Sequence, residues 1–445
     1  MCGIAGLLKL SGPVTSQDVT AVLRMLDAEV HRGPDDWGVL FPESLADDPL
    51  VRREIEARGR GHDFRYAASA SGAAAVLGAR RLSIIDLSEK ARMPMGSSDG
   101  RTWITYNGEI YNFRELRSQL MERGYRFRSD SDTEVLLHGY EEWGDGLLPR
   151  LRGMFACALL RTGSAPALLL AKDRFGIKPL YYYADDERFL FASEVQSLMA
   201  SGLVPYQHNL ETMVRFLQLG SVPLPLTTIR GVHALPAAHM LTCDRGNLHK
   251  RKYWDLNQCF HPEAAADHAD DRLLPLLTDA VRVHSVSDVP LGIFLSGGID
   301  SSALVALASL AGQKPIKTVS VTFNEPEFDE SLYARVIARK YGTQHGEVRL
   351  TRRDFFQELP RIFDAMDQPT VDGVNTYFVS KAAKAFGLTV VFAGTGADEL
   401  FLGYQHLQRA ATLSTVSRFM ARIPREVRSP SGAHRLQYRA ALWTP

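Results

Sequence analysis

The most chemically suggestive residue of this chain is Cys2, which directly follows the initiator Met1. A small second residue is the usual condition for methionine removal, which would leave Cys2 with a free α-amino group. One residue would then carry a nucleophilic thiolate and an amine, with a pKa near about 8, that can manage the thiol proton. Such a pair can attack an amide carbonyl. Position two alone is a weak signal, because many proteins carry an ordinary residue there.

Four further polar motifs follow in the first third of the chain. Three of them have a structural explanation as well as a chemical one: Asn107-Gly108 favours a hairpin turn, Ser131 to Glu134 match a helix capping box, and Arg81 is compatible with an ordinary surface position. Their occurrence together, behind a cysteine at position two, favours a functional interpretation. The motifs are HRGPD at 31–35, RLSIID at 81–86, NGEIYN at 107–112 and SDTE at 131–134.

In this order, CGI and these motifs resemble the N-terminal-nucleophile glutaminase domain of class II glutamine amidotransferases. The resemblance implies that Arg81 binds the α-carboxylate of glutamine, that Asp132 and Glu109 hold its α-ammonium, and that Asn107 with the Gly108 N–H forms the oxyanion hole. A guanidinium fork suits a carboxylate, and amide donors suit a developing oxyanion. The catalytic residues implied are Cys2, Asn107 and Gly108, and the glutamine-binding residues are Arg81, Leu82, Ser83, Ile84, Ile85, Asn107, Gly108, Glu109 and Asp132.

Two glycine-rich loops in the second half each follow an apolar strand and precede a helix: LSGGIDSS at 295–302 and GTGADELF at 394–401. Glycine and serine allow N–H and hydroxyl donors to close on a phosphate, and the helix N-terminus adds partial positive charge. Loops of this kind at neighbouring strand ends would bracket a nucleotide. Neither is a Walker A loop, which needs a lysine after glycine. For SGG alone, an ordinary strand-to-helix turn capped by Asp300 is the alternative.

The first loop matches the SGGxDS signature of ATP pyrophosphatases, and the order of motifs across positions 1 to about 404 is similar to glutamine-hydrolysing asparagine synthetase. YWD at 253–255, FDES at 328–331, DRFGIKPL at 173–180 and FASE at 191–194 belong to the same pattern. The resemblance implies that the last two serve the domain interface and the ammonia route. It implies ATP contacts by Leu295, Ser296, Gly297, Gly298, Asp300, Ser301, Ser302, Val321, Ala393 and Gly394.

A magnesium ion is expected with the nucleotide. Mg²⁺ prefers one or two carboxylates together with phosphate oxygens, so Asp300 and Asp398 are its predicted ligands. Thr395 occupies the adenylate-site position at which asparagine synthetases commonly carry glutamate, and Ala79 stands where related sequences often have histidine. Family members usually continue well beyond Gly403-Tyr404. We therefore expect a second domain shortened at its C-terminus, and a chain that hydrolyses glutamine better than it forms an amide.

Composition favours a soluble enzyme with two domains. A chain of 445 residues exceeds what one core usually organises. Its formal net charge of zero gives no hint of a nucleic-acid partner. The four cysteines are scattered without CxxC spacing, which argues against a disulfide framework or a zinc site and fits the cytoplasm. No stretch approaches the roughly 20 apolar residues that a membrane span needs, and no targeting signal is present.

Hydrophobic patterning predicts an α+β region followed by an α/β region. Short β-like runs extend to about Asn209, with helices starting at Phe113 and after Ser131, and the polar stretch from Trp37 to Ala75 is interpreted as a surface insertion. Farther on, apolar strands alternate with amphipathic helices, which predicts a parallel sheet. The predicted domains are a glutaminase sandwich at 1–209, a connecting segment at 210–272 and an ATP-pyrophosphatase domain at 273–445.

The leading functional hypothesis is an ATP-dependent ligase, asparagine synthase (glutamine-hydrolysing). Ammonia from glutamine would attack β-aspartyl-AMP, giving asparagine, AMP, pyrophosphate and glutamate. A second hypothesis is an amidotransferase that amidates another carboxylate in a specialised pathway. A third is a working glutaminase joined to a non-catalytic ATP-binding module. All three imply small-molecule substrates without a nucleic acid or membrane partner, and they are compatible with a homodimer.

Overall fold

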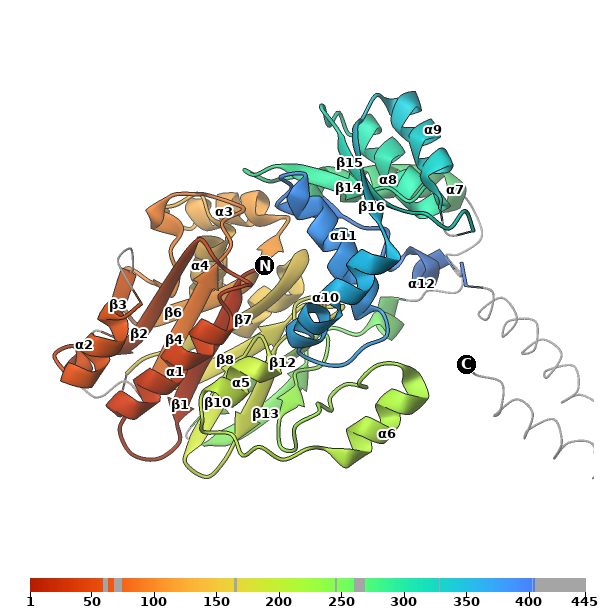
Figure 1. The fold of residues 1–445 in the computed structure, drawn as a ribbon. Coiled ribbons are helices and arrows are strands. Elements are labelled where there is room, and N and C mark those ends of the chain that lie inside the picture. The colour runs from red at the N-terminus through yellow and green to blue at the C-terminus, as the bar shows by residue number, and fades with distance from the viewer. Residues whose placement is uncertain are drawn as a thin grey trace, which may run out of the picture.

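The computed structural model describes residues 1–58, 63–67, 74–163, 166–244, 246–259, 269–327, 329–401 and 403–404. These residues form two mostly antiparallel sheets, which belong to one region, and a parallel sheet that belongs to another (Figure 1). This confirms the predicted α+β region followed by an α/β region. Phe328 of the FDES motif and the segment from residue 405 onward lie outside the described residues.

The first sheet has seven strands in the order β11-β9-β10-β1-β4-β2-β3, and only β2 and β3 pair in parallel. Strand β1 is central, so Cys2 immediately precedes the middle strand of the sheet. The strands are β1 (Gly3–Lys9), β2 (Asp36–Pro42), β3 (Asp63–Ala67), β4 (Ala75–Arg81), β9 (Tyr181–Ala184), β10 (Arg188–Ala192) and β11 (His233–Ala234).

The second sheet has six antiparallel strands in the order β13-β12-β8-β7-β6-β5. Its strands are β5 (Met95–Gly96), β6 (Thr102–Ile110), β7 (Gly153–Arg161), β8 (Ala167–Lys172), β12 (His239–Asp244) and β13 (Asn247–Lys252). Asn107 and Gly108 lie within β6, paired with Ala156 and Phe155 of β7. The hairpin-turn alternative for Asn107-Gly108 is therefore wrong.

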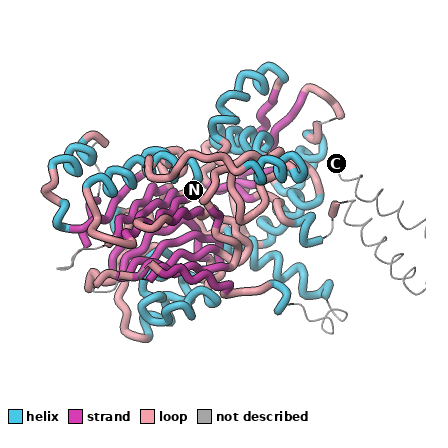
Figure 2. The backbone as a smooth tube through the Cα atoms, turned by 90° about the horizontal axis from the view of Figure 1, so that it is seen from below, coloured by secondary structure: helices cyan, strands magenta, loops and turns pink. Residues whose placement is uncertain are grey.

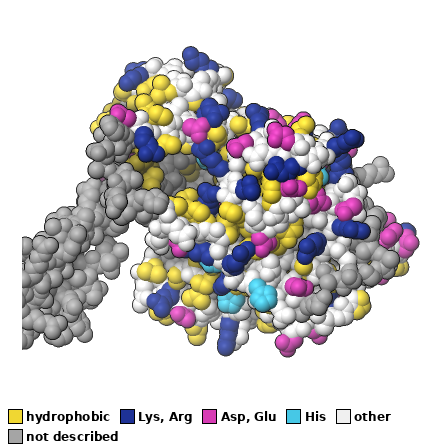
Figure 3. Space-filling view, turned by 180° about the vertical axis from the view of Figure 1, so that it is seen from behind, with side chains coloured by type: hydrophobic (Ala, Val, Ile, Leu, Met, Phe, Trp, Pro, Cys, Tyr) yellow, Lys and Arg dark blue, Asp and Glu magenta, His cyan; other side chains and the backbone are white. Residues whose placement is uncertain are grey.

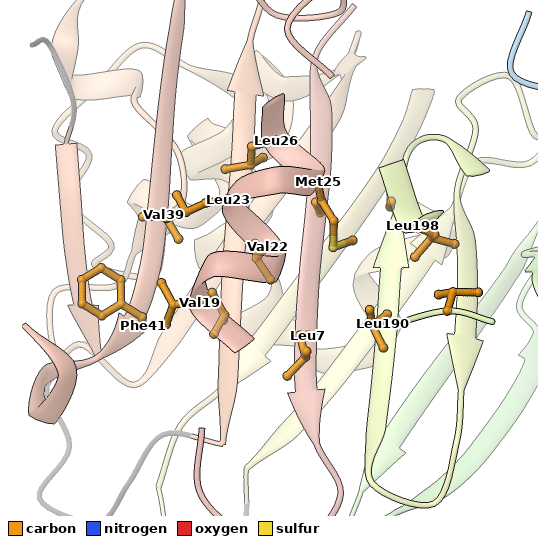
Figure 4. Close-up of a cluster of buried hydrophobic side chains, with 14 of the residues drawn as sticks. Leu7, Val19, Val22, Leu23, Met25, Leu26, Val39, Phe41, Leu190 and Leu198 are labelled. Atoms are coloured by element: carbon orange, nitrogen blue, oxygen red, sulfur yellow. The ribbon is translucent and has the colours of Figure 1, made fainter. Parts of the chain in front are cut away.

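Helices cover the outer faces of both sheets, so the first region is a four-layer sandwich (Figure 2). Leu23 and Leu26 of α1 pack with Val39 of β2 in the core outside the first sheet (Figure 4), while Ile4 and Phe191 belong to the core between the sheets. The helical elements are α1 (Ser16–Ala28), η1 (Glu43–Leu45), α2 (Pro49–Glu56), η2 (Glu89–Ala91), α3 (Phe113–Glu122), α4 (Asp132–Trp143), η3 (Gly144–Arg150) and α5 (Val195–Ala200).

The interpretation of 37–75 as a surface insertion is wrong. Strand β2 begins this stretch and pairs with both β4 and β3. Leu40 packs in the core between the sheets, whereas Val39 and Phe41 pack against the helices on the other face. A strand buried on both faces loses the alternation of polar and apolar residues that identifies a half-exposed strand. Helix α2 also packs in this core through Val51 and Ile55.

The expected connecting segment, 210–272, begins with α6 (Leu210–Leu219). It also contributes β11 to the first sheet and the β12–β13 hairpin to the second, and η4 (Leu256–Cys259) follows. Strand pairing of the first region thus continues to Lys252. The domain boundaries themselves stay predictions.

The α/β region has a parallel sheet in the order β16-β15-β14-β17. Because the chain moves from β14 toward β15 on one side and later adds β17 on the other, the strand order reverses beside β14. Ligands of open α/β sheets bind at the carboxyl ends of strands at such a point. The elements are α7 (Ala269–His284), β14 (Leu291–Phe294), α8 (Ile299–Leu310), β15 (Lys317–Phe323), α9 (Ser331–Tyr341), β16 (Gln344–Leu350), α10 (Arg352–Ala365), α11 (Gly373–Ala385), β17 (Val390–Phe392) and α12 (Ala397–Phe401).

The two regions contact each other through the turn between α10 and α11. Asp367 accepts hydrogen bonds from the N–H groups of Val195 (2.9 Å) and Gln196 (2.7 Å), so it binds the first turn of α5 from across the interface. Burial raises the pKa of Asp367 to about 6 despite these bonds. Gln368 accepts a hydrogen bond from the N–H of Thr228 at 2.9 Å. These polar contacts fix the orientation of α5 relative to the α/β region.

Basic and acidic side chains are interspersed over the face shown in Figure 3, in keeping with the zero net charge of the sequence. Within the described residues, no helix is both long enough and apolar enough to cross a membrane.

Truncating Leu77 tests the core between the sheets. Leu77 of β4 is fully buried there, so we expect Leu77→Ala to lower the free energy of unfolding by about 2–5 kcal/mol through lost burial and a residual cavity. The control Leu87→Ala removes a side chain that is 57% exposed and should change it by no more than about 0.5 kcal/mol. Urea denaturation followed by tryptophan fluorescence measures both. Equal effects would contradict the assigned core.

Candidate functional site

A pocket at the amino end of β1 brings together the predicted glutaminase residues. Of these, only Ser83 is not part of its lining: the Ser83 N–H donates to Asp35 at 2.8 Å, and Ser83 lines a neighbouring groove with Asp36 and Arg80. The pocket is lined by Met1, Cys2, Arg81, Leu82, Ile84, Ile85, Met93, Tyr106, Asn107, Gly108, Glu109, Ser131, Asp132, Thr133 and Lys178.

The Cys2 thiol is held by the backbone of Leu82. The Leu82 N–H donates to Sγ at 3.4 Å, and Sγ lies 3.6 Å from the Leu82 carbonyl oxygen. Behind it, Arg32 Nε donates to the Cys2 carbonyl at 3.1 Å and Arg32 Nη1 donates to the Glu194 carboxylate at 2.8 Å. Arg32 and Glu194 are both buried. These contacts fix the first residues of the chain, where a terminus would otherwise fray.

Asn107 provides a buried donor that the described protein leaves unused. Its side chain is 1% exposed, and its Nδ2 has no hydrogen-bond partner among the described residues. Buried polar groups are nearly always paired, so an unpaired amide in a pocket wall suits an acceptor that arrives with a ligand. The adjacent Gly108 packs tightly: a Cβ there would lie 2.3 Å from the carbonyl oxygen of Met154.

Two acids lie in the same pocket. Asp132 accepts hydrogen bonds from the Tyr106 hydroxyl (2.8 Å) and the Ile110 N–H (2.9 Å), but burial still raises its pKa. Burial, with a smaller contribution from Asp132, raises the pKa of Glu109 to about 7, while the Lys178 ammonium opposes that rise. Two carboxyl groups desolvated side by side favour a cation between them.

The Arg81 guanidinium both lines the pocket and holds the loop that follows it. Its Nη2 donates to the carbonyl oxygens of Ile85 (3.2 Å) and Asp86, and its Nη1 lies 3.4 Å from that of Ser88. Asp86 has a positive φ of 55°, a conformation that Asp tolerates better than most residues. Arg81 therefore folds residues 82–88 into the pocket wall.

The SDTE motif positions Asp132 through ordinary helix capping. Ser131 caps α4 by accepting the Thr133 N–H at 3.2 Å. Glu134 accepts the N–H groups of Arg128 and Ser129; burial alone would raise its pKa, but hydrogen bonds from His138, Ser129 and Arg128 lower it to about 2. The Ser131 cap is thus present, but the predicted capping box is not formed, because Glu134 binds the N–H groups of Arg128 and Ser129 in place of that of Ser131. The cap fixes the turn that presents Asp132 to the pocket.

Sequence reasoning gave no site role to six of the lining residues: Met1, Met93, Tyr106, Ser131, Thr133 and Lys178. Lys178 lies in the DRFGIKPL motif, which was expected at the interface; it is buried, and burial lowers its pKa. The one sequence signal that could have pointed to Lys178 was that a single lysine stands between apolar residues before a strand. Desolvation lowers the pKa of the Met1 amine to about 6, although the Met1 side chain is exposed. Removal of Met1 would leave the free α-amine on Cys2, the next residue of the chain.

A second pocket lies at the carboxyl ends of β14 and β15. It contains three of the predicted ATP contacts, Leu295, Ser296 and Val321. The remaining predicted ATP residues do not line it: Gly297 and Gly298 belong to the loop after β14, Ala393 and Gly394 to the loop after β17, and Asp300, Ser301 and Ser302 to the first turn of α8. The pocket is lined by Phe294, Leu295, Ser296, Val319, Ser320, Val321, Phe323, Glu330, Ser331, Asn375, Val379 and Ala382.

The SGGIDSS loop is closed around Ser301. The N–H groups of Ser296 and Gly297 lie 3.3 Å from Ser301 Oγ. Gly297 has a φ of +93°, and a Cβ there would lie 2.5 Å from Tyr333 Cβ, so the turn requires glycine. Ser302 Oγ is buried without a partner among the described residues. An unpaired hydroxyl and loop amides at the start of α8 suit phosphate oxygens.

The second predicted loop lies beside the first. A Cβ on Gly394 would come within 3.0 Å of Asp300 Cβ, so the loop after β17 contacts the start of α8 at the point where strand order reverses. Ala393 and Thr395 are exposed. Asp398 follows in α12, where its carboxylate faces Gly403. Among the described residues no cluster of three or more His, Cys, Asp or Glu could hold a metal ion, so Asp300 and Asp398 would need phosphate oxygens as additional ligands.

Comparison with known proteins identifies the family to which the chain belongs. A sequence model of the glutamine amidotransferase domain matches residues 43–254, and one of asparagine synthase matches residues 272–444. A putative glutamine-hydrolysing asparagine synthetase of Methanocaldococcus jannaschii is 30% identical over 91% of this chain and 76% of its own length. The chain belongs to the glutamine-hydrolysing asparagine synthetase family. Cys2 precedes the segment that the first family model matches.

Other members of the asparagine synthetase family are longer. Glutamine-hydrolysing asparagine synthetase 1 of Bacillus subtilis is 34% identical over 94% of this chain, which spans 61% of that relative. A relative with another name, amidase chry2 of Gibberella zeae, is 31% identical over 93% of this chain and 61% of its own length. The chain therefore spans about three fifths of the length of these two curated relatives.

We predict that the raised pKa of Glu109 makes the affinity of the pocket for glutamine depend on pH. With a pKa of about 7 instead of 4.5, Glu109 is neutral below pH 7 and loses its attraction for an α-ammonium. We expect calorimetry on Cys2→Ala to show glutamine binding that weakens as pH falls from about 8 to about 6, approaching tenfold per unit at the acid end. Adding Glu109→Gln should flatten that profile, whereas adding Glu115→Gln on the exposed face of α3 should not. An unchanged slope with Glu109→Gln would contradict the assignment.

Proposed function

We propose that the chain hydrolyses glutamine at Cys2 and uses the ammonia to amidate a carboxylate activated by ATP. The observation that supports this most is the meeting of Cys2, Asn107, Arg81 and two buried acids in one pocket of an asparagine synthetase family member. In this proposal the glutaminase domain spans 1–209, the segment 210–272 connects and extends its sheets, and residues 273–445 belong to the ATP-pyrophosphatase domain.

Hydrolysis begins once Met1 has been removed. The Cys2 α-amine takes the thiol proton, directly or through a water, and Sγ attacks the glutamine δ-carbonyl. Asn107 Nδ2 and the Gly108 N–H stabilise the oxyanion, the C–N bond breaks, and the amine returns the proton to the leaving ammonia. Water then hydrolyses the γ-glutamyl thioester to glutamate and restores the thiol.

The remaining pocket residues select glutamine. Arg81 forms the ion pair with its α-carboxylate, and Glu109 with Asp132 accepts hydrogen bonds from its α-ammonium. Leu82, Ile84 and Ile85 supply the wall along the side chain, and Ser83 acts through the backbone of the same loop. These groups already face one another in the pocket, which avoids the reorganisation cost that weakens catalysis in water.

The second domain would bind ATP with Leu295, Val321 and the Ala393-Gly394 backbone around the adenosine. Ser296, Gly297, Gly298, Ser301 and Ser302 would surround the phosphates. A carboxylate oxygen attacks the α-phosphorus, pyrophosphate leaves, and ammonia displaces AMP from the acyl-adenylate. Asp300 and Asp398 fit Mg²⁺, whose chemistry there is to neutralise the pyrophosphate charge. In this scheme L-aspartate is the acceptor and β-aspartyl-AMP is the intermediate.

A second candidate is an amidotransferase for a different carboxylate. The name of the Gibberella zeae relative, an amidase, favours it, as does Thr395, whose neutral hydroxyl replaces the acid that is common at this position. The two candidates differ in which acid supports pyrophosphate release from ATP. A glutaminase joined to a non-catalytic ATP-binding module would release no pyrophosphate with any of the acids. Assaying pyrophosphate release against a panel of carboxylic acids separates the three.

Removing the nucleophile tests the first half-reaction. We expect Cys2→Ala to abolish glutamate release, because no other group in the pocket can form the thioester, while synthesis from added ammonium salts continues. The control Cys259→Ala changes an exposed cysteine and should keep the parent rate. Comparable glutaminase rates in Cys2→Ala and the parent would defeat the assignment.

The oxyanion hole is tested at Asn107. Asn107→Ala should lower kcat for glutamine hydrolysis by about 10²–10³ with little change in KM, since the lost donor acts mainly in the transition state. Asn112→Ala is the matched control, because the Asn112 side chain of the same motif bonds instead to the backbone of Arg150 and Arg152. Steady-state glutamate release measures both variants, and an equal effect of the two would remove Asn107 from this role.

A further inference from the structure

The loop that lines the glutamine pocket is held from the other domain by Asp288. Asp288 Oδ2 accepts the N–H of Asp86 at 2.8 Å, and the Asp288 N–H donates to the Ile84 carbonyl at 3.0 Å. This reciprocal pair joins positions 202 residues apart in the sequence. Two hydrogen bonds in opposite directions fix both the distance and the orientation of the loop.

Asp86 links the Asp288 contact to two parts of the pocket wall, the loop after β4 and the turn before α4. Its carboxylate accepts the Ser88 N–H at 3.0 Å and the Asp130 N–H at 2.8 Å, and Asp130 comes two residues before Asp132. Its carbonyl oxygen accepts a hydrogen bond from Arg81. The side chain and carbonyl of Asp86 are therefore bound within the first domain, and its N–H is bound by Asp288.

The segment that carries Asp288 also leads to the second pocket. Three residues after Asp288, β14 begins at Leu291, and β14 ends directly before Leu295 and Ser296 of the second pocket. One short stretch of chain thus contacts the glutamine pocket at one end and lines the proposed ATP site at the other.

We propose that Asp288 is a positioning residue for glutamine, by which the second domain completes the substrate-binding surface of the first. The proposal rests on the glutaminase function proposed above. Asp288 does not line the pocket, so it acts through Asp86 and Ile84 rather than on the substrate. Losing it should loosen the carboxylate-binding side of the pocket from Ile84 onward. Leu82 directly follows β4 and binds the thiol, so the thiol, the amine and the oxyanion donors should stay in place.

The expected signature is a change in KM without a matching change in kcat. A hydrogen bond to a charged acceptor is worth enough to give about a tenfold effect, so Asp288→Ala should raise KM for glutamine about tenfold and leave kcat within about twofold. Asp288→Asn keeps an oxygen that accepts the Asp86 N–H and should recover most of the parent KM. Cys2 should react with iodoacetamide at the parent rate in both variants.

The matched control is Asp279→Ala. Asp279 also pairs across the domain interface, with Arg152 at 2.9 Å, but it has no contact with residues 82–88. It should keep the parent KM. Hydrogen–deuterium exchange supplies a readout that does not depend on activity: amides of residues 82–88 should exchange faster in Asp288→Ala, but not in Asp279→Ala.

The proposal is overturned by a parent-like KM in Asp288→Ala, by an equal KM change in Asp279→Ala, by a failure of Asp288→Asn to recover affinity, or by unchanged exchange of residues 82–88. A parent chain without any glutaminase activity that depends on Cys2 would instead defeat the proposed function. The exchange experiment would still decide whether Asp288 orders the loop.

Discussion

A nucleophile at the amino terminus of its own chain, as proposed for Cys2, has to be held by contacts that form only after the whole domain has folded. In this protein the holding contacts come from distant residues: Leu82 fixes the Cys2 thiol, and Arg32 fixes the Cys2 carbonyl while pairing with the buried Glu194. Strand β1 then carries the chain into the middle of the seven-stranded sheet. The sandwich therefore serves first to make the most mobile part of a chain rigid.

The pocket around Cys2 concentrates ionisable groups that burial makes costly. The pKa values of Glu109 and Asp132 are raised and that of Lys178 is lowered, in each case mainly by burial. Such shifts mean that the empty pocket disfavours the charged forms of these groups. In the proposed function a zwitterionic amino acid would supply partners for these charges, so burial would strengthen their interactions with the substrate. In the same way, the unpaired side-chain amide of Asn107 would gain a hydrogen-bond acceptor when an oxyanion forms.

Local sequence patterns predicted the elements that are governed by local physics. The strand-to-helix loop at 295–302 and the capped start of α4 agree with the structure, because turn chemistry and capping act over a few residues. Strand β2 was missed, since burial on both faces removes its alternation. The positions of Lys178 in the pocket lining and of Asp288 against the pocket loop were also missed, because each depends on a contact with a segment far away in sequence. Ser83 was predicted as a glutamine-binding residue because it belongs to the RLSIID motif, but it lines a neighbouring groove instead.

The central claim is that the amino-terminal cysteine forms a thioester with glutamine. The most direct measurement is mass spectrometry of protein quenched in acid during turnover with glutamine, digested with trypsin at a pH that preserves thioesters. The account predicts a γ-glutamyl adduct on the peptide from Cys2 to Lys9, with Met1 removed and a free α-amine. A peptide that still begins at Met1, or an adduct on Cys157, Cys243 or Cys259 in place of Cys2, would contradict it.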